Sequence, residues 1–192
     1  MTVRLTQSNK EGGVYFITFT CYAWKPLFAQ TNAYDAVYKW FDYLVAKGGG
    51  IIGFVIMPNH LHLLLHLPSS FKTPNAVVGN AKRFLSYEII KRLEKMGDEP
   101  LLQELHAAVK KREAKKGQIH RVFEESFDCK ACYSAKFIAQ KLAYIHHNPV
   151  RGKWQLADDF ALYPHSSAPF YFATGRNVYK QLVRVEDVVL GG

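Results

Sequence analysis

The stretch from Ile51 to Leu67 reads IIGFVIMPNHLHLLLHL, and its hydrophobic pattern decides the fold. Its first part, Ile51 to Met57, is continuously apolar once glycine is allowed, which is typical of a strand covered on both faces. Pro58 and Asn59 interrupt the run, and a second strand is expected from His60 to Leu67. The sequence therefore predicts a central β-hairpin.

The second strand of this hairpin alternates histidine with leucine. Successive side chains of a strand point to opposite faces, so His60, His62 and His66 share one face. The leucines at positions 61, 63 and 65 share the other face, which suits a hydrophobic core. Neighbouring side chains on one face lie about 7 Å apart, so a metal ion can lie between two imidazoles. Hydrogen-bonded core or surface histidines would give the same pattern, so the pair alone leaves both interpretations open.

Other segments with regular spacing surround the hairpin. A β-branched and aromatic run predicts a strand from Val14 to Thr20, and an edge strand is expected within residues 119–129. Apolar residues recur at helical spacing in four segments, which cover residues 32–47, 74–95, 101–116 and 133–147. This order predicts an α+β fold, a ferredoxin-like antiparallel sheet with helices on one face.

Length and composition favour one compact domain. The chain has 192 residues, of which 48% are hydrophobic and 21% charged, so there is enough apolar material for a core and global disorder is excluded. We expect a single domain over residues 1–192, with a basic helical insertion around 100–120 and a C-terminal extension from about residue 152. No apolar run approaches the roughly 20 residues of a membrane helix. With a polar N-terminus and only three cysteines, a reduced, cytoplasmic protein without a membrane partner is expected.

The charge balance favours a polyanionic partner. The chain carries 25 lysines and arginines against 16 acidic residues, a net charge of +9. The most cationic segment runs from Lys110 to Arg121 and contains a single acid, Glu113. Such charge runs are often only solvated faces, so the segment alone does not establish nucleic-acid binding.

Two separated motifs carry a resemblance to a known family. The first is Met57-Pro58-Asn59-His60-Leu61-His62-Leu63-Leu64, and the second is Tyr144-Ile145-His146-His147-Asn148-Pro149-Val150-Arg151. Together they resemble the single-tyrosine HUH transposases of bacterial insertion sequences, and the second motif looks most like the REP-associated group. A later segment, Tyr163-Pro164-His165-Ser166-Ser167, resembles a signature near the family's C-terminus. The resemblance spans roughly residues 14–167.

The resemblance implies the HUH nuclease/transposase fold, a divalent metal site and a tyrosine that cuts single-stranded DNA. Carried over to this sequence, it makes His60 and His62 metal ligands and Tyr144 the nucleophile. The family's third ligand is a polar side chain one helical turn after the tyrosine, where Asn148 stands. His147 is a competing third ligand. Without the first motif, Tyr144 would be read as an ordinary helix tyrosine and Asn148 as a helix cap.

The chemistry that the resemblance implies is physically reasonable. A phenol with a pKa of about 10 is a poor nucleophile at neutral pH unless positive charge or a base lies nearby. Mg²⁺ or Mn²⁺ can neutralise charge on a phosphate oxygen and orient the phosphate for attack. The expected activity is that of a DNA transposase, a site-specific single-strand endonuclease and strand transferase with a 5′-phosphotyrosine intermediate.

The expected partner is single-stranded DNA, flanked by a hairpin. Phosphate contacts are predicted for the basic side chains Lys82, Arg83, Lys110, Lys111, Arg112, Lys115, Lys116, Arg121 and Arg151. One departure from the family is the acidic stretch at residues 122–128, where relatives carry tryptophan and arginine, and it concerns target recognition. The sequence leaves a monomer and a homodimer both open.

Two other function classes compete with this prediction. One is a non-catalytic or domesticated nucleic-acid-binding protein of the same fold, acting on repeated palindromes. The other is a metal-dependent enzyme that uses the histidines on a small molecule, which gives no reason for the basic surface. A structural zinc site at Cys129 and Cys132 is disfavoured because Cys21 is the only other cysteine.

Overall fold

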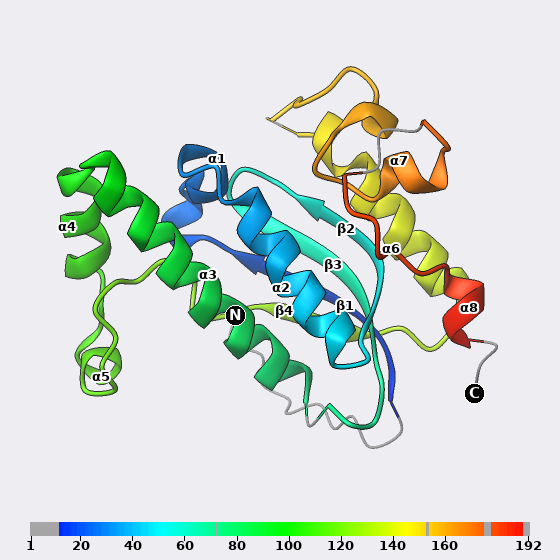
Figure 1. The fold of residues 1–192 in the computed structure, drawn as a ribbon, viewed down its shortest axis with the longest axis horizontal. Coiled ribbons are helices and arrows are strands. Elements are labelled where there is room, and N and C mark those ends of the chain that lie inside the picture. The colour runs from blue at the N-terminus through cyan, green and yellow to red at the C-terminus, as the bar shows by residue number, and fades with distance from the viewer. Residues whose placement is uncertain (1–11, 72, 153, 175–177, 190–192) are drawn as a thin grey trace.

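The computed structural model describes residues 12–71, 73–152, 154–174 and 178–189. Within these residues, four strands form one antiparallel sheet, at the centre of Figure 1, in the order β2-β3-β1-β4. The strands are β1 (Gly13–Thr20), β2 (Gly50–Ile56), β3 (His60–Leu67) and β4 (Asp128–Ala131). This is the strand order of a ferredoxin-like sheet, as the sequence predicted.

Strand β3 is central and is paired on both edges. It pairs with β1 along its whole length, from Gly13 opposite Leu67 to Thr20 opposite His60. Its other edge pairs with β2, which confirms the predicted hairpin. Because strands on both sides satisfy its backbone, β3 holds its side chains in a fixed register.

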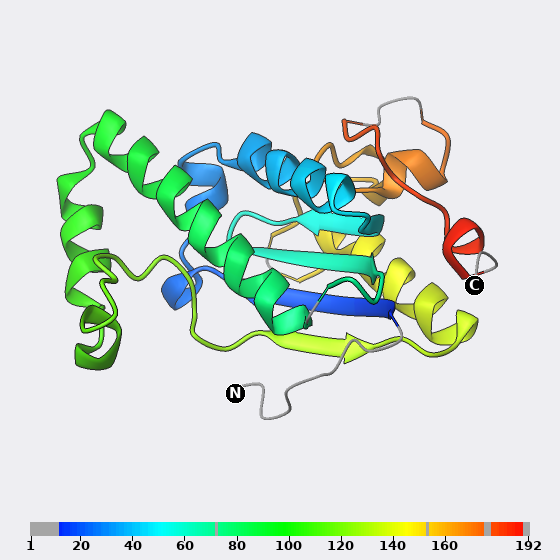
Figure 2. The same cartoon turned by 60° about the horizontal axis from the view of Figure 1, so that its bottom comes forward.

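Helices α2 (Tyr34–Ala46) and α3 (Pro74–Met96) cover one face of the sheet (Figures 1 and 2). Their apolar sides and the leucine face of β3 share one hydrophobic core. The hydroxyl of Thr73 accepts a hydrogen bond from the Ala76 backbone N–H at 3.1 Å and caps the start of α3. Gly97, with a φ of 70°, ends this helix in the left-handed conformation.

Helix α6 (Ala135–His147) corrects one detail of the prediction, because it lies on the opposite face of the sheet (Figure 2). Its residues Ile138 and Ile145 form a second core with Phe16 and Leu64. These sheet residues point away from α2 and α3 and would expose apolar surface to water if every helix lay on one face. Burial of this second apolar face therefore places α6 there.

The cationic insertion forms a lobe of two helices, at the left of Figure 1, and we call residues 99–121 the basic lobe. It contains α4 (Glu99–Ala107) and the short α5 (Lys111–Ala114), so the helix expected over residues 101–116 is interrupted. Lys110 has extended backbone angles, and its N–H donates to the Glu113 carboxylate at 3.0 Å, which starts α5. The edge strand expected within residues 119–129 is β4, which begins only at Asp128.

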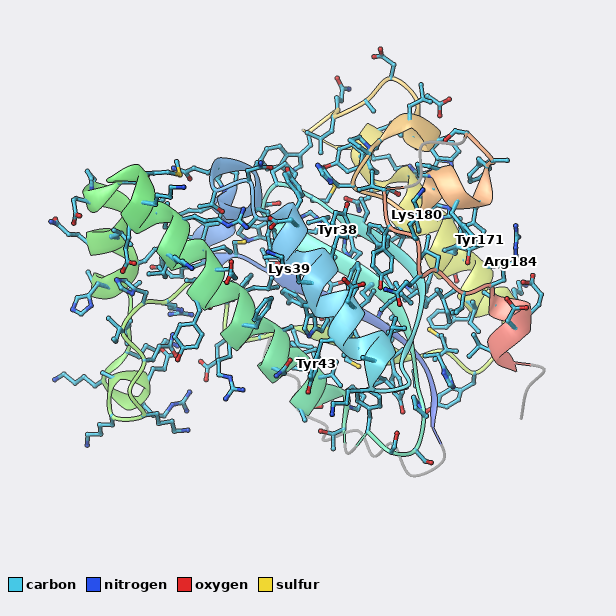
Figure 3. All side chains as sticks on the ribbon, in the orientation of Figure 1. Tyr38, Lys39, Tyr43, Tyr171, Lys180 and Arg184 are labelled. Carbon is cyan, nitrogen blue, oxygen red and sulfur yellow. The ribbon has the colours of Figure 1, made fainter. Side chains whose placement is uncertain are left out.

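Short elements connect and extend these layers. They are η1 (Tyr22–Trp24), α1 (Leu27–Gln30), η2 (Asn148–Val150), η3 (Phe160–Leu162), α7 (Ala168–Tyr171) and α8 (Val185–Val189). Figure 3 labels Tyr171 and Arg184 next to α6. The Tyr171 hydroxyl donates to the Ile52 carbonyl at 2.9 Å, and the Arg184 guanidinium lies 6.0 Å from the Tyr171 ring centroid. These contacts fasten the C-terminal segment beside β2. Among the described residues, no helix is long and apolar enough to cross a membrane.

Candidate active site

A pair of histidines lies at the start of β3, on the face that α6 covers. The side chains of His60 and His62 are only 8% and 5% exposed, and their ring centroids lie 4.7 Å apart. His66 shares this face but lies farther along the strand, opposite Val14. The alternation predicted from the sequence is therefore present, with two of the three histidines in ring contact.

Neighbouring side chains orient both rings. The Asn59 side-chain oxygen accepts a hydrogen bond from His60 Nδ1 at 2.7 Å, and Thr18 Oγ1 hydrogen-bonds His62 Nδ1 at 2.6 Å. Thr18 lies directly opposite His62 in the β1–β3 register. With its Nδ1 engaged, His62 has Nε2 left for a ligand, because this nitrogen has no hydrogen-bond partner among the described residues. Partners of this kind fix the rings of metal-ligating histidines in other proteins.

Burial keeps the two imidazoles neutral. Desolvation lowers the pKa of His60 to about 4, although a hydrogen bond that the protonated ring would donate to the Asn148 side chain opposes this shift. Desolvation also lowers the pKa of His62 well below its usual value, with further contributions from the His60 and Lys141 charges. A neutral imidazole keeps a lone pair on one ring nitrogen, which metal binding requires.

Helix α6 brings Tyr144 to this histidine pair. Ser134 caps the start of the helix, because its hydroxyl accepts a hydrogen bond from the Phe137 N–H at 3.2 Å. The Tyr144 ring centroid lies 5.1 Å from that of His62, and its side chain is 44% exposed. Two residues that are distant in the sequence are thus in ring contact. The tyrosine is accessible to a large substrate, whereas the histidines lie beneath it.

The end of α6 distinguishes the two candidates for a third ligand. Asn148 is the C-terminal cap residue of the helix, and its side chain lies within hydrogen-bonding reach of the His60 ring. The His147 ring instead packs on Phe160 at a centroid distance of 4.1 Å, and its Nδ1 hydrogen-bonds the Ala143 carbonyl at 2.9 Å. The geometry therefore favours Asn148 as the partner of the histidine pair.

Lys141 is a site residue that the sequence analysis missed. Its ammonium nitrogen lies 4.8 Å from the Phe16 ring centroid, 5.1 Å from that of Phe137 and 5.9 Å from that of Tyr144. The signal that could have found it is helical spacing, because a residue three positions before Tyr144 lies on the same side of the helix. The site thus holds a cation, steadied by aromatic faces, beside the exposed tyrosine.

The donor set fits a divalent metal ion. His62 Nε2 is buried and has no hydrogen-bond partner among the described residues, as expected for a nitrogen that awaits a ligand. No group of three His, Cys, Asp or Glu residues in the described part of the chain could hold a metal, so the third protein donor would be the Asn148 amide. Two imidazoles and an amide oxygen suit Mn²⁺ better than Mg²⁺, which prefers oxygen ligands.

Two of the basic residues predicted to bind DNA have partners inside the protein. The Lys82 ammonium donates to the backbone carbonyls of Glu124, Glu125 and Ser126 at 2.7, 3.3 and 3.1 Å. Burial lowers the pKa of Lys82 to about 8. Arg121 pairs with Glu124 at 3.1 Å. Both side chains therefore support the chain that leads into β4, and their phosphate contacts stay predictions.

The other predicted DNA contacts lie on the surface. Lys110 and Arg112 both form ion pairs with Glu125, which neutralises part of the basic lobe. The exposed basic residues outside this pairing are Arg83, Lys111, Lys115, Lys116 and Arg151. Figures 1 and 2 show α4 and α5 at the opposite end of the molecule from α6 to α8. The structure thus does not place the basic lobe beside α6, the helix that carries Tyr144.

Comparisons with known proteins support the fold. No family model and no curated protein sequence matches the chain. A solved structure of a REP-associated tyrosine transposase bound to a REP hairpin matches with a TM-score of 0.59 and 16% identity, over 100% of this chain and 96% of that chain. A protein from Deinococcus radiodurans, described as a candidate transposase, matches with a TM-score of 0.37 and 16% identity, over 74% of this chain and 95% of that chain.

The first of these matches covers the whole chain and so includes the four-stranded sheet and the helices on both of its faces. The chain therefore has the fold of a REP-associated tyrosine transposase, and the resemblance predicted from the two motifs is confirmed at the level of the fold.

Proposed function

We propose that the protein is a metal-dependent tyrosine transposase that cleaves and rejoins single-stranded DNA. The observation that carries this proposal is the contact of Tyr144 with a buried, oriented histidine pair, at 5.1 Å between the Tyr144 and His62 ring centroids. The similarity in fold to a protein bound to a REP hairpin supports DNA as the partner. The charge of +9 agrees with a polyanionic substrate.

In the proposed reaction, the phenolic oxygen of Tyr144 attacks the phosphorus of a phosphodiester in line with the 3′ oxygen. The phenolic proton passes to solvent, a bond forms between tyrosine and the 5′ phosphate, and the departing 3′ oxygen takes up a proton. The phosphotyrosine preserves the energy of the broken phosphodiester bond. A second 3′ hydroxyl can therefore reverse the step and join new ends without ATP.

Different side chains of the site would have different roles in this reaction. Burial and the hydrogen bonds with Thr18 and Asn59 hold the histidine rings, and Asn148 completes the set that would bind Mg²⁺ or Mn²⁺. Such an ion, when bound, supplies a positive charge that neutralises a phosphate oxygen and orients it for attack. The ammonium of Lys141 lies 5.9 Å from the Tyr144 ring centroid and would add a positive charge beside a phosphate that reaches this tyrosine.

We propose a single strand beside a hairpin as the substrate form. Attack on a phosphate held between Tyr144 and two buried histidines needs a backbone that bends into the site, which a continuous duplex resists. The exposed cations of the basic lobe, Lys111, Lys115 and Lys116, would hold the phosphates of the duplex stem. In this arrangement, the basic lobe would bind the duplex stem and the site around Tyr144 would cleave the single strand.

A covalent-adduct assay tests the proposal. The substrate is a 3′-labelled hairpin flanked by randomised single strands, since the labelled fragment is the one that stays on the tyrosine. With Mn²⁺ or Mg²⁺, the protein should carry the label through denaturing electrophoresis, and EDTA should prevent this. The Tyr144→Phe variant should bind DNA and form no adduct, because only the nucleophilic oxygen is removed.

The same assay distinguishes the other function classes. Binding of the hairpin without any adduct would favour a non-catalytic DNA-binding protein of this fold. An adduct in the Tyr144→Phe variant would assign the nucleophile to another tyrosine, such as Tyr133 or Tyr163. Comparable cleavage of the fully duplex sequence would refute the single-strand assignment, and equal cleavage in EDTA would refute the metal.

A further inference from the structure

Trp24 is an exposed aromatic residue beside the histidine pair. It ends η1, directly after β1, and its side chain is 60% exposed. Its ring centroid lies 6.1 Å from that of His60, with the two ring planes inclined by 65°. An indole buries a large apolar area when it packs in a core, so this exposure leaves a broad apolar face open at the rim of the site.

The backbone that presents this tryptophan is strained. Ala23 and Trp24 have φ values of 50° and 58°, in the left-handed region that residues with a Cβ atom rarely adopt. Two successive residues of this kind persist only where surrounding contacts enforce them. Strain of this sort is concentrated at ligand-binding and active sites, and here it lies beside the histidine pair.

Specific hydrogen bonds enforce the strained turn. The Ala23 N–H donates to the Glu124 carboxylate at 2.8 Å, and the Trp24 N–H donates to the Cys21 carbonyl at 3.1 Å. The Asn59 amide donates to the Trp24 carbonyl at 3.1 Å, while its oxygen accepts from His60 Nδ1 at 2.7 Å. One side chain therefore fixes both the tryptophan backbone and the first histidine ring, so their relative position is built into the fold.

The rings of the site form a row. Trp24 contacts His60, His60 contacts His62 at 4.7 Å, and His62 contacts Tyr144 at 5.1 Å between ring centroids. The two ends of the row are exposed, and the two histidines between them are buried. Trp24 is therefore the exposed ring next to His60, and Tyr144 is the exposed ring next to His62.

We propose that Trp24 is a stacking platform for an unpaired base of the strand that Tyr144 cleaves. The inference rests on the proposed function and adds a base-binding position to it. Every base offers a flat π-face, so the platform tolerates different bases and requires only that the base be unpaired. This requirement selects single-stranded DNA at the point of cleavage.

Binding measurements with altered strands test this proposal. The Tyr144→Phe protein, which cannot cleave, is titrated into a fluorescently labelled hairpin with single-stranded flanks, and an abasic site is moved along the flanks. Trp24→Ala added to this protein should weaken binding about 5- to 150-fold, the range found for loss of one base stack. Trp24→Phe should retain most of the affinity, because its ring still stacks.

Two controls separate stacking from a structural role. Tyr87→Ala removes an aromatic side chain that is 72% exposed on α3, across the sheet, and should leave the affinity unchanged. Mn²⁺ alone should bind the Trp24→Ala variant as it binds the unchanged protein, which shows that His60 keeps its position. An abasic site at one position should weaken the binding of DNA to the protein that retains Trp24. The same abasic site should not weaken binding to the Trp24→Ala variant any further.

The possible results each decide the proposal. The proposal that Trp24 stacks on a base would be overturned if the proteins with and without Trp24 bound DNA with equal affinity. It would also be overturned if Trp24→Ala lowered the affinity by the same factor for every abasic strand. Failure of the protein to bind single strands at all would overturn both the platform and the proposed function. Coupling of Trp24 to one abasic position, together with no covalent adduct from the protein that retains Tyr144, would support the platform and refute the proposed cleavage.

Discussion

Successive residues of strand β3 alternate between two faces of the sheet, and the two faces have different roles. On one face, Leu61, Leu63 and Leu65 are fully buried against α2 and α3 in an apolar core. On the other face, His60 and His62 contact side chains from β1 and α6, each through a polar or aromatic group. The leucine face contributes stability through buried area, whereas the histidine face buries polar groups that must be satisfied individually.

The largest expected effect comes from the histidine face. His60→Ala and His62→Ala should each lower metal-dependent cleavage by at least about 100-fold, because each removes a donor from a set of three. Cleavage is measured by the adduct assay over a range of Mn²⁺ concentrations. His66→Ala is the matched control on the same face, and cleavage by this variant should be close to that of the unchanged protein. Equal losses in all three variants would mean that the effect is structural.

Removal of a leucine from the opposite face should change stability and leave the chemistry intact. Leu63→Ala should lower the free energy of unfolding by about 2–5 kcal/mol, because truncation of the fully buried side chain leaves a cavity between β3 and its covering helices. Urea denaturation followed by circular dichroism measures this change. The folded fraction of the variant should form the adduct at the normal rate, and a large decrease in that rate would show that the two faces are coupled.

Replacement of Asn148 should have a smaller effect than loss of a histidine. Asn148→Ala should lower cleavage by about 10-fold, because water can take the place of the amide as a metal ligand. His147→Ala is the comparison, and its ring packs on Phe160 away from the pair. If cleavage depends more on His147 than on Asn148, the third ligand must be reassigned.

A half-buried histidine outside the site, His165, should make folding sensitive to acid. The His165 ring stacks on Tyr34 at 3.6 Å, and burial lowers its pKa to about 4. The unfolded chain, with a histidine pKa of about 6.5, then binds more protons between pH 6.5 and 4. Stability is therefore lost as the pH falls through this window.

The His165→Gln variant should reduce this sensitivity by about 1 kcal/mol between pH 7 and 5, measured as the difference in unfolding free energy from the unchanged protein. His106→Gln, at an exposed position on α4, serves as the control. The same pH dependence of stability in all three proteins would show that His165 binds the same number of protons in the folded and the unfolded protein.

The smallest expected effect concerns the basic lobe. Alanine at Lys111, Lys115 and Lys116 should reduce the slope of log affinity against log salt by about 0.7–0.9 for each phosphate that the lobe no longer neutralises. Substitutions at Lys110 and Arg112 should change the slope less, because Glu125 already pairs with both. The slope is measured by titration of the hairpin at several salt concentrations. An unchanged slope in the triple variant would show that the lobe lies away from DNA.

Much of the architecture was predictable because it is local. The alternation in β3 and the apolar run in β2 specify the hairpin through a period of two residues, and helical spacing specifies α2, α3 and α6. The histidine pair was predictable for the same reason, since strand geometry alone puts His60 and His62 on one face. The role given to Tyr144 came from the motif resemblance, because its helical period predicts only a surface position.

Other features depend on contacts between segments that are far apart in the sequence. The contact of Lys141 with Phe16, the approach of Asn148 to His60 and the hydrogen bonds of Lys82 to backbone carbonyls each join different elements. The exposed Trp24 depends on Asn59 and Glu124 in the same way. The spacing of residues within one segment does not predict contacts between distant segments. The sequence therefore does not distinguish a lysine at the site, such as Lys141, from a lysine that supports a loop, such as Lys82.

The sequence by itself determined the hairpin of β2 and β3, the strand β1 and the helices α2, α3 and α6, and which side of each is apolar. Only the tertiary structure decided that α6 covers the second face of the sheet and so brings Tyr144 to the histidines. The physical reason is that periodicity specifies the direction of side chains within an element, whereas both faces of this sheet are apolar. The choice between those faces depends on how all the helices share the burial of apolar surface.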